Sequence, residues 1–250
     1  ASGGVIDTGA LAITGVTTVS AGGDVALNTV TNNFQGAVKI AANNVEVVDA
    51  GAIDLGASTV TGTYRVTATA GGDITNSGVL TISGGAIFKA ASGQSIYLNE
   101  SNIFSSTVAF TTPSGNLANV TVRDTTDFDL AALTLSGDLI VTSTGGSITD
   151  SGALAITGTS TLVTSANGAT IVLDTTTNAF TGAVTITTND NDSPTDGTYA
   201  AHVTIDGGTT ALIIAASTID GDLTLRSGNA SGITDSGTVT VGGNLAATTN

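Results

Sequence analysis

Three carboxylates in one stretch have the types and spacing that could bind a metal ion. Asp190, Asp192 and Asp196 lie within a short run of acidic and polar sequence and could offer oxygen ligands to Ca²⁺. The stretch does not follow the EF-hand pattern, because Pro194 takes the third acidic position and no late glutamate follows. A solvated surface loop is therefore the favoured interpretation, with a calcium site as the alternative.

A second group of residues could support hydrolytic chemistry. Asp127 and Asp129 are two residues apart, so on a strand both side chains would lie on one outer face. Paired carboxylates carry out acid–base chemistry in enzymes that cleave glycosidic bonds, but the other repeats of the chain show no matching acid-rich groove. His202 is the only histidine, and a structural role for it is favoured over a Ser-His-Asp site. We assign no catalytic residue and no cofactor.

The composition argues against several classes of partner. Five Lys and Arg residues face 20 Asp and Glu residues, which gives a formal charge of −15. Nucleic acid is a poor partner for such a chain, because phosphate binding needs clustered basic residues. No cysteine is present, which excludes thiolate metal sites, and no apolar run is long enough for a transmembrane helix.

A long sequence repeat, of about 70 to 75 residues, organises the chain. Its first landmark is an Ile-Thr-Asx-Ser-Gly element, and its second is a phenylalanine that follows an asparagine by two residues. The repeats span 3–70, 71–144 and 145–229, with a partial repeat at 230–250. The recurring positions are Val5, Ile74, Ile148 and Ile233 at the start of the first landmark, its glycines Gly78, Gly152 and Gly237, and the phenylalanines Phe34, Phe104 and Phe180.

The pattern inside each repeat predicts the fold. Apolar residues alternate with small or polar ones in short runs such as 24–28, which is typical of strands with one buried face. A repeat of this length divides into about three coils of roughly 23 residues. We therefore predict an all-β protein, a single continuous β-solenoid over residues 1–250 with about three coils per repeat. A β-propeller is the alternative, although the repeats that form its blades are shorter than this one.

Stacking of the coils gives each recurring residue type an expected place. Like residues should lie over like residues about 4.8 Å apart, with Val, Ile and Leu filling a narrow interior. Glycines are expected at corners where a Cβ would force an unfavourable backbone conformation. We interpret the three phenylalanines as packing positions in preference to an exposed strip for sugars. Pro194 and Gly197 predict an insertion loop near 188–200.

Three stretches resemble the repeat region of filamentous haemagglutinin-type adhesins, which are large bacterial surface exoproteins of two-partner secretion and related autotransporter systems. They are 148–158, 178–184 and 54–62, and the resemblance extends over nearly the whole chain. It implies a right-handed parallel β-helix, export from a Gram-negative-type cell, and a role in attachment or in a matrix.

These observations together predict a non-enzymatic, extracellular structural segment of a bacterial adhesin or cell-surface fibre. It would act as a stiff spacer or as a building block of a filament or coat. The expected partners are neighbouring repeats, identical subunits stacked end to end, and host-cell or matrix glycans and proteins. The alternatives are a carbohydrate-active β-helix enzyme and a Ca²⁺-stabilised module that binds polysaccharides.

Overall fold

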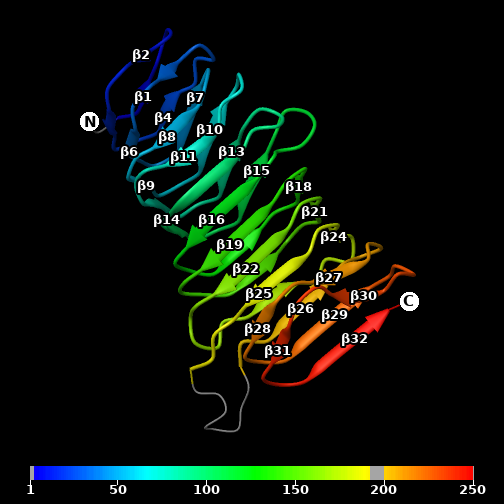
Figure 1. Ribbon diagram of the computed structural model, residues 1–250. Helices are drawn as coiled ribbons and strands as arrows, with labels where there is room; N and C mark the ends of the chain where they lie inside the picture. Colours follow the sequence, from blue (N-terminus) through cyan, green and yellow to red (C-terminus); the bar gives the residue numbers. More distant parts are fainter. Residues whose placement is uncertain (1–2, 192–199, 250) are drawn as a thin grey trace. The chain divides into compact units, whose positions relative to one another are not determined.

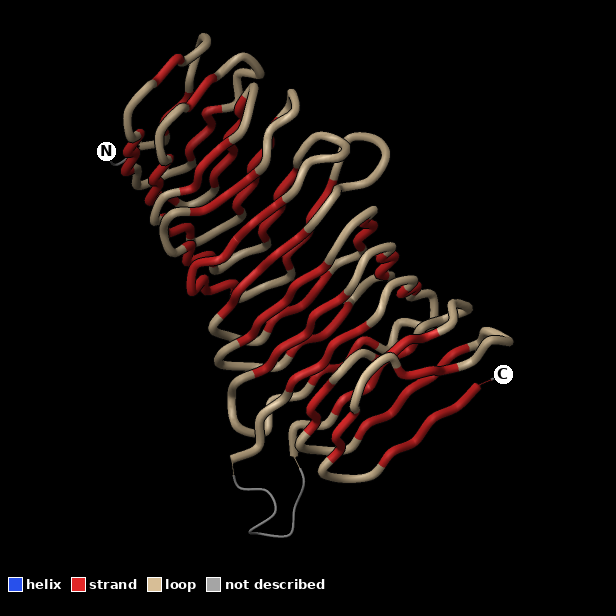
Figure 2. The backbone as a smooth tube through the Cα atoms, viewed as in Figure 1, coloured by secondary structure: helices blue, strands red, loops and turns tan. Residues whose placement is uncertain are grey.

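The computed structural model describes residues 3–191 and 200–249, which form strands, turns and loops and contain no helix (Figures 1 and 2). The chain divides into two compact units, residues 1–124 and 125–250. Within each unit every strand pairing that joins one coil to the next is parallel, as in Val5 on Val25 and Phe128 on Ile148. The all-β, parallel solenoid predicted from the sequence is confirmed in both units.

Three strands make up each of the first four coils of the first unit, β1 to β12. Strands β1, β4, β7, β10, β13 and β15 form one sheet, so every third strand returns to the same side until β14 spans a corner. Each strand of this sheet pairs with the strand one coil further along the chain, as Val25 does with Val45 and Tyr64 with Ala86. The strands are β1 (Val5–Ile6), β2 (Ala12–Ile13), β3 (Thr17–Ser20), β4 (Val25–Leu27), β5 (Asn33–Phe34), β6 (Val38–Ala42), β7 (Val45–Asp49), β8 (Ile53–Leu55), β9 (Ser58–Val60), β10 (Tyr64–Ala68), β11 (Ile74–Asn76), β12 (Leu80–Ile82), β13 (Ala86–Lys89), β14 (Ile96–Phe104), β15 (Val108–Thr111) and β16 (Val120–Asp124).

The second unit repeats this arrangement. Strands β17, β20, β23, β26, β29 and β32 form one sheet, and Figure 1 shows β26, β29 and β32 side by side, in orange to red. One coil of this unit is longer than the others, because the expected insertion falls between the paired residues Ile171 and Val203. The strands are β17 (Phe128–Leu130), β18 (Leu133–Leu135), β19 (Leu139–Ser143), β20 (Ile148–Asp150), β21 (Leu154–Ile156), β22 (Ser160–Thr164), β23 (Ile171–Leu173), β24 (Ala179–Phe180), β25 (Val184–Thr187), β26 (Val203–Asp206), β27 (Leu212–Ile214), β28 (Ser217–Ile219), β29 (Leu223–Ser227), β30 (Ile233–Asp235), β31 (Val239–Val241) and β32 (Leu245–Thr249).

The core is a column of side chains that point inward from consecutive coils. Alternate residues of the strands are buried, which is why the sequence alternates. In the first unit Phe88 is the centre of an aromatic group, with ring centroids 6.0 Å from Tyr64, 6.0 Å from Phe104 and 5.9 Å from Phe110. Aromatic pairs at this spacing add stability beyond the area they bury.

The sequence repeat does not contain a whole number of coils. Val5 lies in β1 and Ile74 in β11, ten strands later; Ile148 lies in β20 and Ile233 in β30, again ten strands later. Because a coil has three strands, each of these two intervals is three coils plus one strand. Equivalent residues of consecutive repeats within a unit therefore lie on different faces, and the residues directly above and below Ile74 are Ile53 and Ile96.

The landmark glycines lie where coils approach one another closely. A Cβ on Gly78, Gly152 or Gly237 would come closer than 3.0 Å to the backbone nitrogen of an alanine in the preceding coil. None of the three has a positive φ, so the expected conformational reason is wrong for them, and lack of space between coils is the cause. Gly71, whose φ is +82°, does fit the conformational explanation.

We expect the substitution Gly152→Ala to destabilise the second unit by about 1–3 kcal/mol, because its methyl group would overlap the backbone of Ala132. Gly9 occupies the same repeat position in the first coil, where an added Cβ meets no atom within 4 Å. Gly9→Ala is therefore the matched control, and its urea unfolding midpoint should stay near that of the parent. Equal midpoints for the two variants would contradict the steric explanation.

Candidate functional site

The asparagine of each second landmark is buried between coils. Asn32, Asn102 and Asn178 are at most 1% exposed. Each accepts a hydrogen bond through Oδ1 from the backbone N–H of a leucine in the preceding coil, at 2.9 Å from Leu11, 3.0 Å from Leu80 and 2.8 Å from Leu154. An interior N–H that no strand partner reaches is thereby satisfied, which buried backbone groups require.

The same asparagines contact the Asx residue of the first landmark. The Nδ2 group donates to a carboxylate at 2.7 Å both from Asn32 to Asp7 and from Asn178 to Asp150. In the middle repeat the roles are exchanged, and Asn76 donates from Nδ2 to Oδ1 of Asn102 at 2.9 Å. We refer to the Asx residue, the leucine four residues later and the asparagine of the next coil as the asparagine clamp.

A buried carboxylate holds the backbone at two of the phenylalanine landmarks. Phe34 donates its N–H to Asp49 Oδ2 at 2.6 Å, and Phe104 donates to Asp124 Oδ1 at 3.0 Å. Both aspartates are at most 1% exposed. Asp206 ends the corresponding strand β26 and accepts the N–H of Gly208 at 2.8 Å. The side chains of Phe34, Phe104 and Phe180 are at most 2% exposed.

Side chains at one corner of the coils form a ladder of hydrogen bonds to the backbone of the next coil. Asp24 accepts the N–H of Asn44 at 3.1 Å, and Asn44 in turn accepts the N–H of Thr63 at 2.9 Å. Two residues singled out in the sequence occupy such positions in the second unit. Asp127 accepts the N–H of Ser147 at 2.8 Å through Oδ1, and His202 accepts the N–H of Asp222 at 2.9 Å through Nδ1.

The remaining candidates also have partners in neighbouring chain segments. Asp129 accepts the hydroxyl of Ser151 at 2.7 Å. Asp190 is nearly buried at the start of the insertion, and its Oδ2 accepts the N–H of Ala200 at 2.9 Å. Asp192 and Asp196 lie outside the described residues. Within 3–191 and 200–249 no three His, Cys, Asp or Glu side chains gather closely enough to hold a metal ion.

The two carboxylates of the asparagine clamps differ in their electrostatics. Burial is the largest influence on the Asp7 carboxyl and raises its pKa, but hydrogen bonds from Asn32 and the backbone of the same coil outweigh it and hold the pKa below 3.8. At Asp150 burial dominates over the hydrogen bond from Asn178 and raises the pKa above 3.8. Ionisation is therefore favoured by folding at Asp7 and opposed by it at Asp150.

We expect opposite pH dependences from the variants Asp7→Asn and Asp150→Asn. The stability that Asp7 contributes is present above its unfolded-state pKa and is lost as pH falls through its lower folded-state pKa. The contribution of Asp150 is present below its unfolded-state pKa and is lost as pH rises through its higher folded-state pKa. Urea unfolding midpoints between about pH 2 and pH 7 test this: relative to the parent, Asp7→Asn should gain on acidification and Asp150→Asn should gain as pH rises. A change of the same sign in both variants would contradict it.

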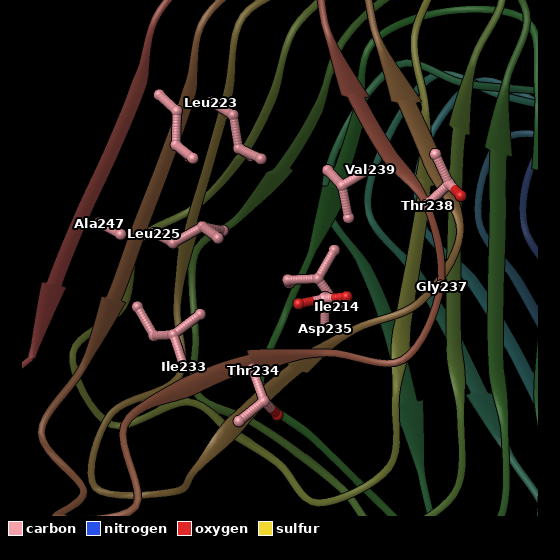
Figure 3. Close-up of a pocket in the computed structure, with 11 residues that line it drawn as sticks. Ile214, Leu223, Leu225, Ile233, Thr234, Asp235, Gly237, Thr238, Val239 and Ala247 are labelled. Carbon is pink, nitrogen blue, oxygen red and sulfur yellow. The ribbon is translucent and has the colours of Figure 1, made fainter.

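The last described coil leaves the interior of the second unit open. A pocket of about 350 Å³ lies there between β29, β30, β31 and β32, and Figure 3 shows Leu223, Leu225, Ile233 and Val239 around one space. Leu245 is 61% exposed, whereas Leu223, its partner in the preceding coil, is 1% exposed. Strand β32 pairs with β29 on one side only within the described residues.

Two of the three positions of an asparagine clamp are present at this open end. Asp235 has the Asx position and Val239, four residues later, has the leucine position. Asp235 is exposed, lines the pocket, and forms no side-chain hydrogen bond within residues 200–249. In the three complete clamps the third member is an asparagine of the following coil.

Parallel coils tied together by laddered side chains define the class of β-solenoid repeat proteins. The chain belongs to the family described as repeats of unknown function (DUF5649), whose model matches residues 1–41, 42–111, 117–187 and 200–250. Neither the curated proteins nor the solved structures include a match to it. Residues 188–199, the expected insertion, fall between two matched repeats. No helix in the described residues is long and apolar enough to cross a membrane.

Proposed function

We propose that the chain is a non-enzymatic structural segment of a bacterial cell-surface protein, a stiff spacer of the adhesin type that acts outside the cell. The observation that carries the proposal is that the recurring buried asparagines form hydrogen bonds between coils. In each of the three built clamps the asparagine joins one coil to the preceding one. Such hydrogen bonds resist sliding and separation of coils, which is what a spacer under tension needs.

The extracellular and adhesive parts of the proposal rest on the sequence. Its landmarks resemble adhesin repeats, and its polar surface is rich in Thr, Ser and Asn with few charges. The expected lateral partners are host-cell or matrix glycans and proteins, while neighbouring repeats or identical subunits would continue the coils at the ends. Asp127 and Asp129, which would have to carry sugar hydrolysis, are engaged with Ser147 and Ser151 of the next coil, and we do not propose an enzyme.

A mechanical experiment tests the spacer function. The protein would be held between handles at residues 1 and 250 and stretched in an optical trap. A stiff solenoid should lengthen little and then unfold in discrete steps, and Asn178→Ala should lower the force of at least one step. Gradual extension at low force, as for an unstructured linker, would contradict the proposal.

A labelling experiment tests the location. Antibodies against the purified segment, applied to intact cells of the producing organism, should stain them without permeabilisation, with a cytoplasmic protein as the negative control. Staining that requires lysis would exclude a surface role. The absence of an enzyme can be tested on acidic polysaccharides: turnover that is lost in Asp127→Ala or Asp129→Ala would overturn the non-enzymatic part.

A further inference from the structure

The open end of the second unit carries more than unpaired backbone. It also carries two side-chain positions of an asparagine clamp whose third residue is not among residues 200–249. In the built clamp of the same unit, Asp150 accepts the Nδ2–H of Asn178 at 2.7 Å, and Leu154 donates its N–H to the same asparagine at 2.8 Å. Asp235 and Val239 repeat the first two members of that clamp. The third member is the only one that residues 200–249 do not supply.

The apolar surface beside Asp235 has a matching unfilled position. Each clamp asparagine is followed two residues later by a phenylalanine that stacks on an apolar residue of the preceding coil. The registered pairs are Phe34 on Ile13, Phe104 on Ile82 and Phe180 on Ile156. Val241 has the position of Ile156 in the last coil and remains partly exposed. An Asn-x-Phe sequence would therefore engage Asp235 and cover Val241 at the same time.

We propose that this end is a docking surface for a parallel coil that carries an Asn-x-Phe element, of the kind formed by residues 23–43. The proposal deepens the structural function above and rests on it, since it names the partner that continues the solenoid. The docked asparagine completes the clamp through Nδ2 to Asp235 and Oδ1 to the N–H of Val239. The docked phenylalanine covers Val241, the rest of the coil closes the neighbouring pocket of about 350 Å³ beside Asp235 and Val239, and the backbone of the coil pairs with the open edge of β32.

Charge makes the surface selective among coils of this chain. A coil of the first-landmark type, such as residues 3–20, would in the same register place Asp7 over Asp235, and two carboxylates one strand spacing apart repel. An asparagine adds no charge and supplies a donor. The end should therefore accept the Asn-x-Phe coil and disfavour the first coil, residues 3–20, of a second copy of the chain.

The test extends the protein in register, because residues 231–250 repeat residues 3–22. The extended protein carries a copy of residues 23–49 after Asn250, and the measurement is hydrogen exchange of the β32 amides. The appended coil should slow exchange in β32 at least about tenfold relative to the unextended protein. Replacing the appended asparagine, the copy of Asn32, by alanine should remove most of that protection.

A double-mutant comparison isolates the contact with the carboxylate. Asp235→Ala should leave the unextended protein unchanged, because its side chain has no hydrogen-bond partner among residues 200–249, and should weaken β32 protection in the extended protein. Equal protection with and without the appended asparagine would overturn the proposal, as would an appended coil that fails to protect β32. Filaments of the unextended protein with a protected β32 would also overturn it, because a second copy would then be the occupant. The stretching experiment uses the unextended chain, so the two proposals can fail separately.

Discussion

Replacement of Asn178 by alanine is expected to lower the free energy of unfolding of the second unit by about 3 kcal/mol. The asparagine is only 1% exposed, and its loss leaves the N–H of Leu154 without its partner in the interior and removes one donor from the half-buried carboxylate of Asp150, which keeps the N–H of Asp174. An unsatisfied buried group costs about 1–3 kcal/mol, and more where it is charged. Urea unfolding monitored by circular dichroism measures the change.

The control for this prediction is an asparagine of the same unit that lies on the surface. Asn191 is exposed, so Asn191→Ala should change stability by no more than about 0.5 kcal/mol. At low pH the cost of Asn178→Ala should shrink, because a protonated Asp150 carries no charge for the Nδ2 group of Asn178 to stabilise. If Asn178→Ala were no more destabilising than Asn191→Ala, the clamp would not hold the coils together.

The substitution Phe180→Ala is expected to cost about 3–5 kcal/mol, the largest effect of any single change considered. Phe180 is fully buried and lies in register on Ile156. The interior around Phe180 is a narrow column between strands. Neighbouring coils therefore cannot close the space left by the ring without breaking the backbone hydrogen bonds between their strands. The loss therefore includes a cavity term as well as the transfer of the ring to water.

Phe180→Leu is the matched variant, since it keeps most of the apolar volume. We expect a cost of less than about 1.5 kcal/mol for it, and a difference between the two variants that tracks the size of the cavity. Differential scanning calorimetry of the three proteins provides the comparison. Similar melting temperatures for the alanine variant and the parent would show that the ring does not support the coil stack.

The solenoid could be predicted because its strands alternate and its landmarks recur. The number of coils in one sequence repeat could not be predicted, because it depends on where each strand ends at a corner. Strand β14 shows the difficulty: Ile96 pairs with Ile74 in one strand of the preceding coil, and Phe104 pairs with Ile82 in the next strand of that coil. A period-two pattern does not mark where such a strand turns.

The composition of the chain hides the asparagine clamp from sequence-based prediction. Asparagine favours turns and surfaces, and the chain is rich in it, so the residue type alone does not predict a role in the interior. The available signal was the fixed offset of two residues between Asn102 or Asn178 and a phenylalanine that had to be buried. A strand places residues two apart on the same face, so the asparagine had to point inward as well.

Within each unit, equivalent residues of consecutive repeats are ten strands apart, whereas one coil has three strands. This offset affects how a partner that binds the side of the solenoid meets successive copies of a motif. In the first unit Thr8 and Ser77 are equivalent exposed residues, yet they follow strands that belong to different sheets. The same holds for Ser151 and Ser236 in the second unit. A bivalent antibody or lectin specific for one such motif would find the adjacent copies facing different directions. It would therefore gain little avidity from consecutive copies within a unit.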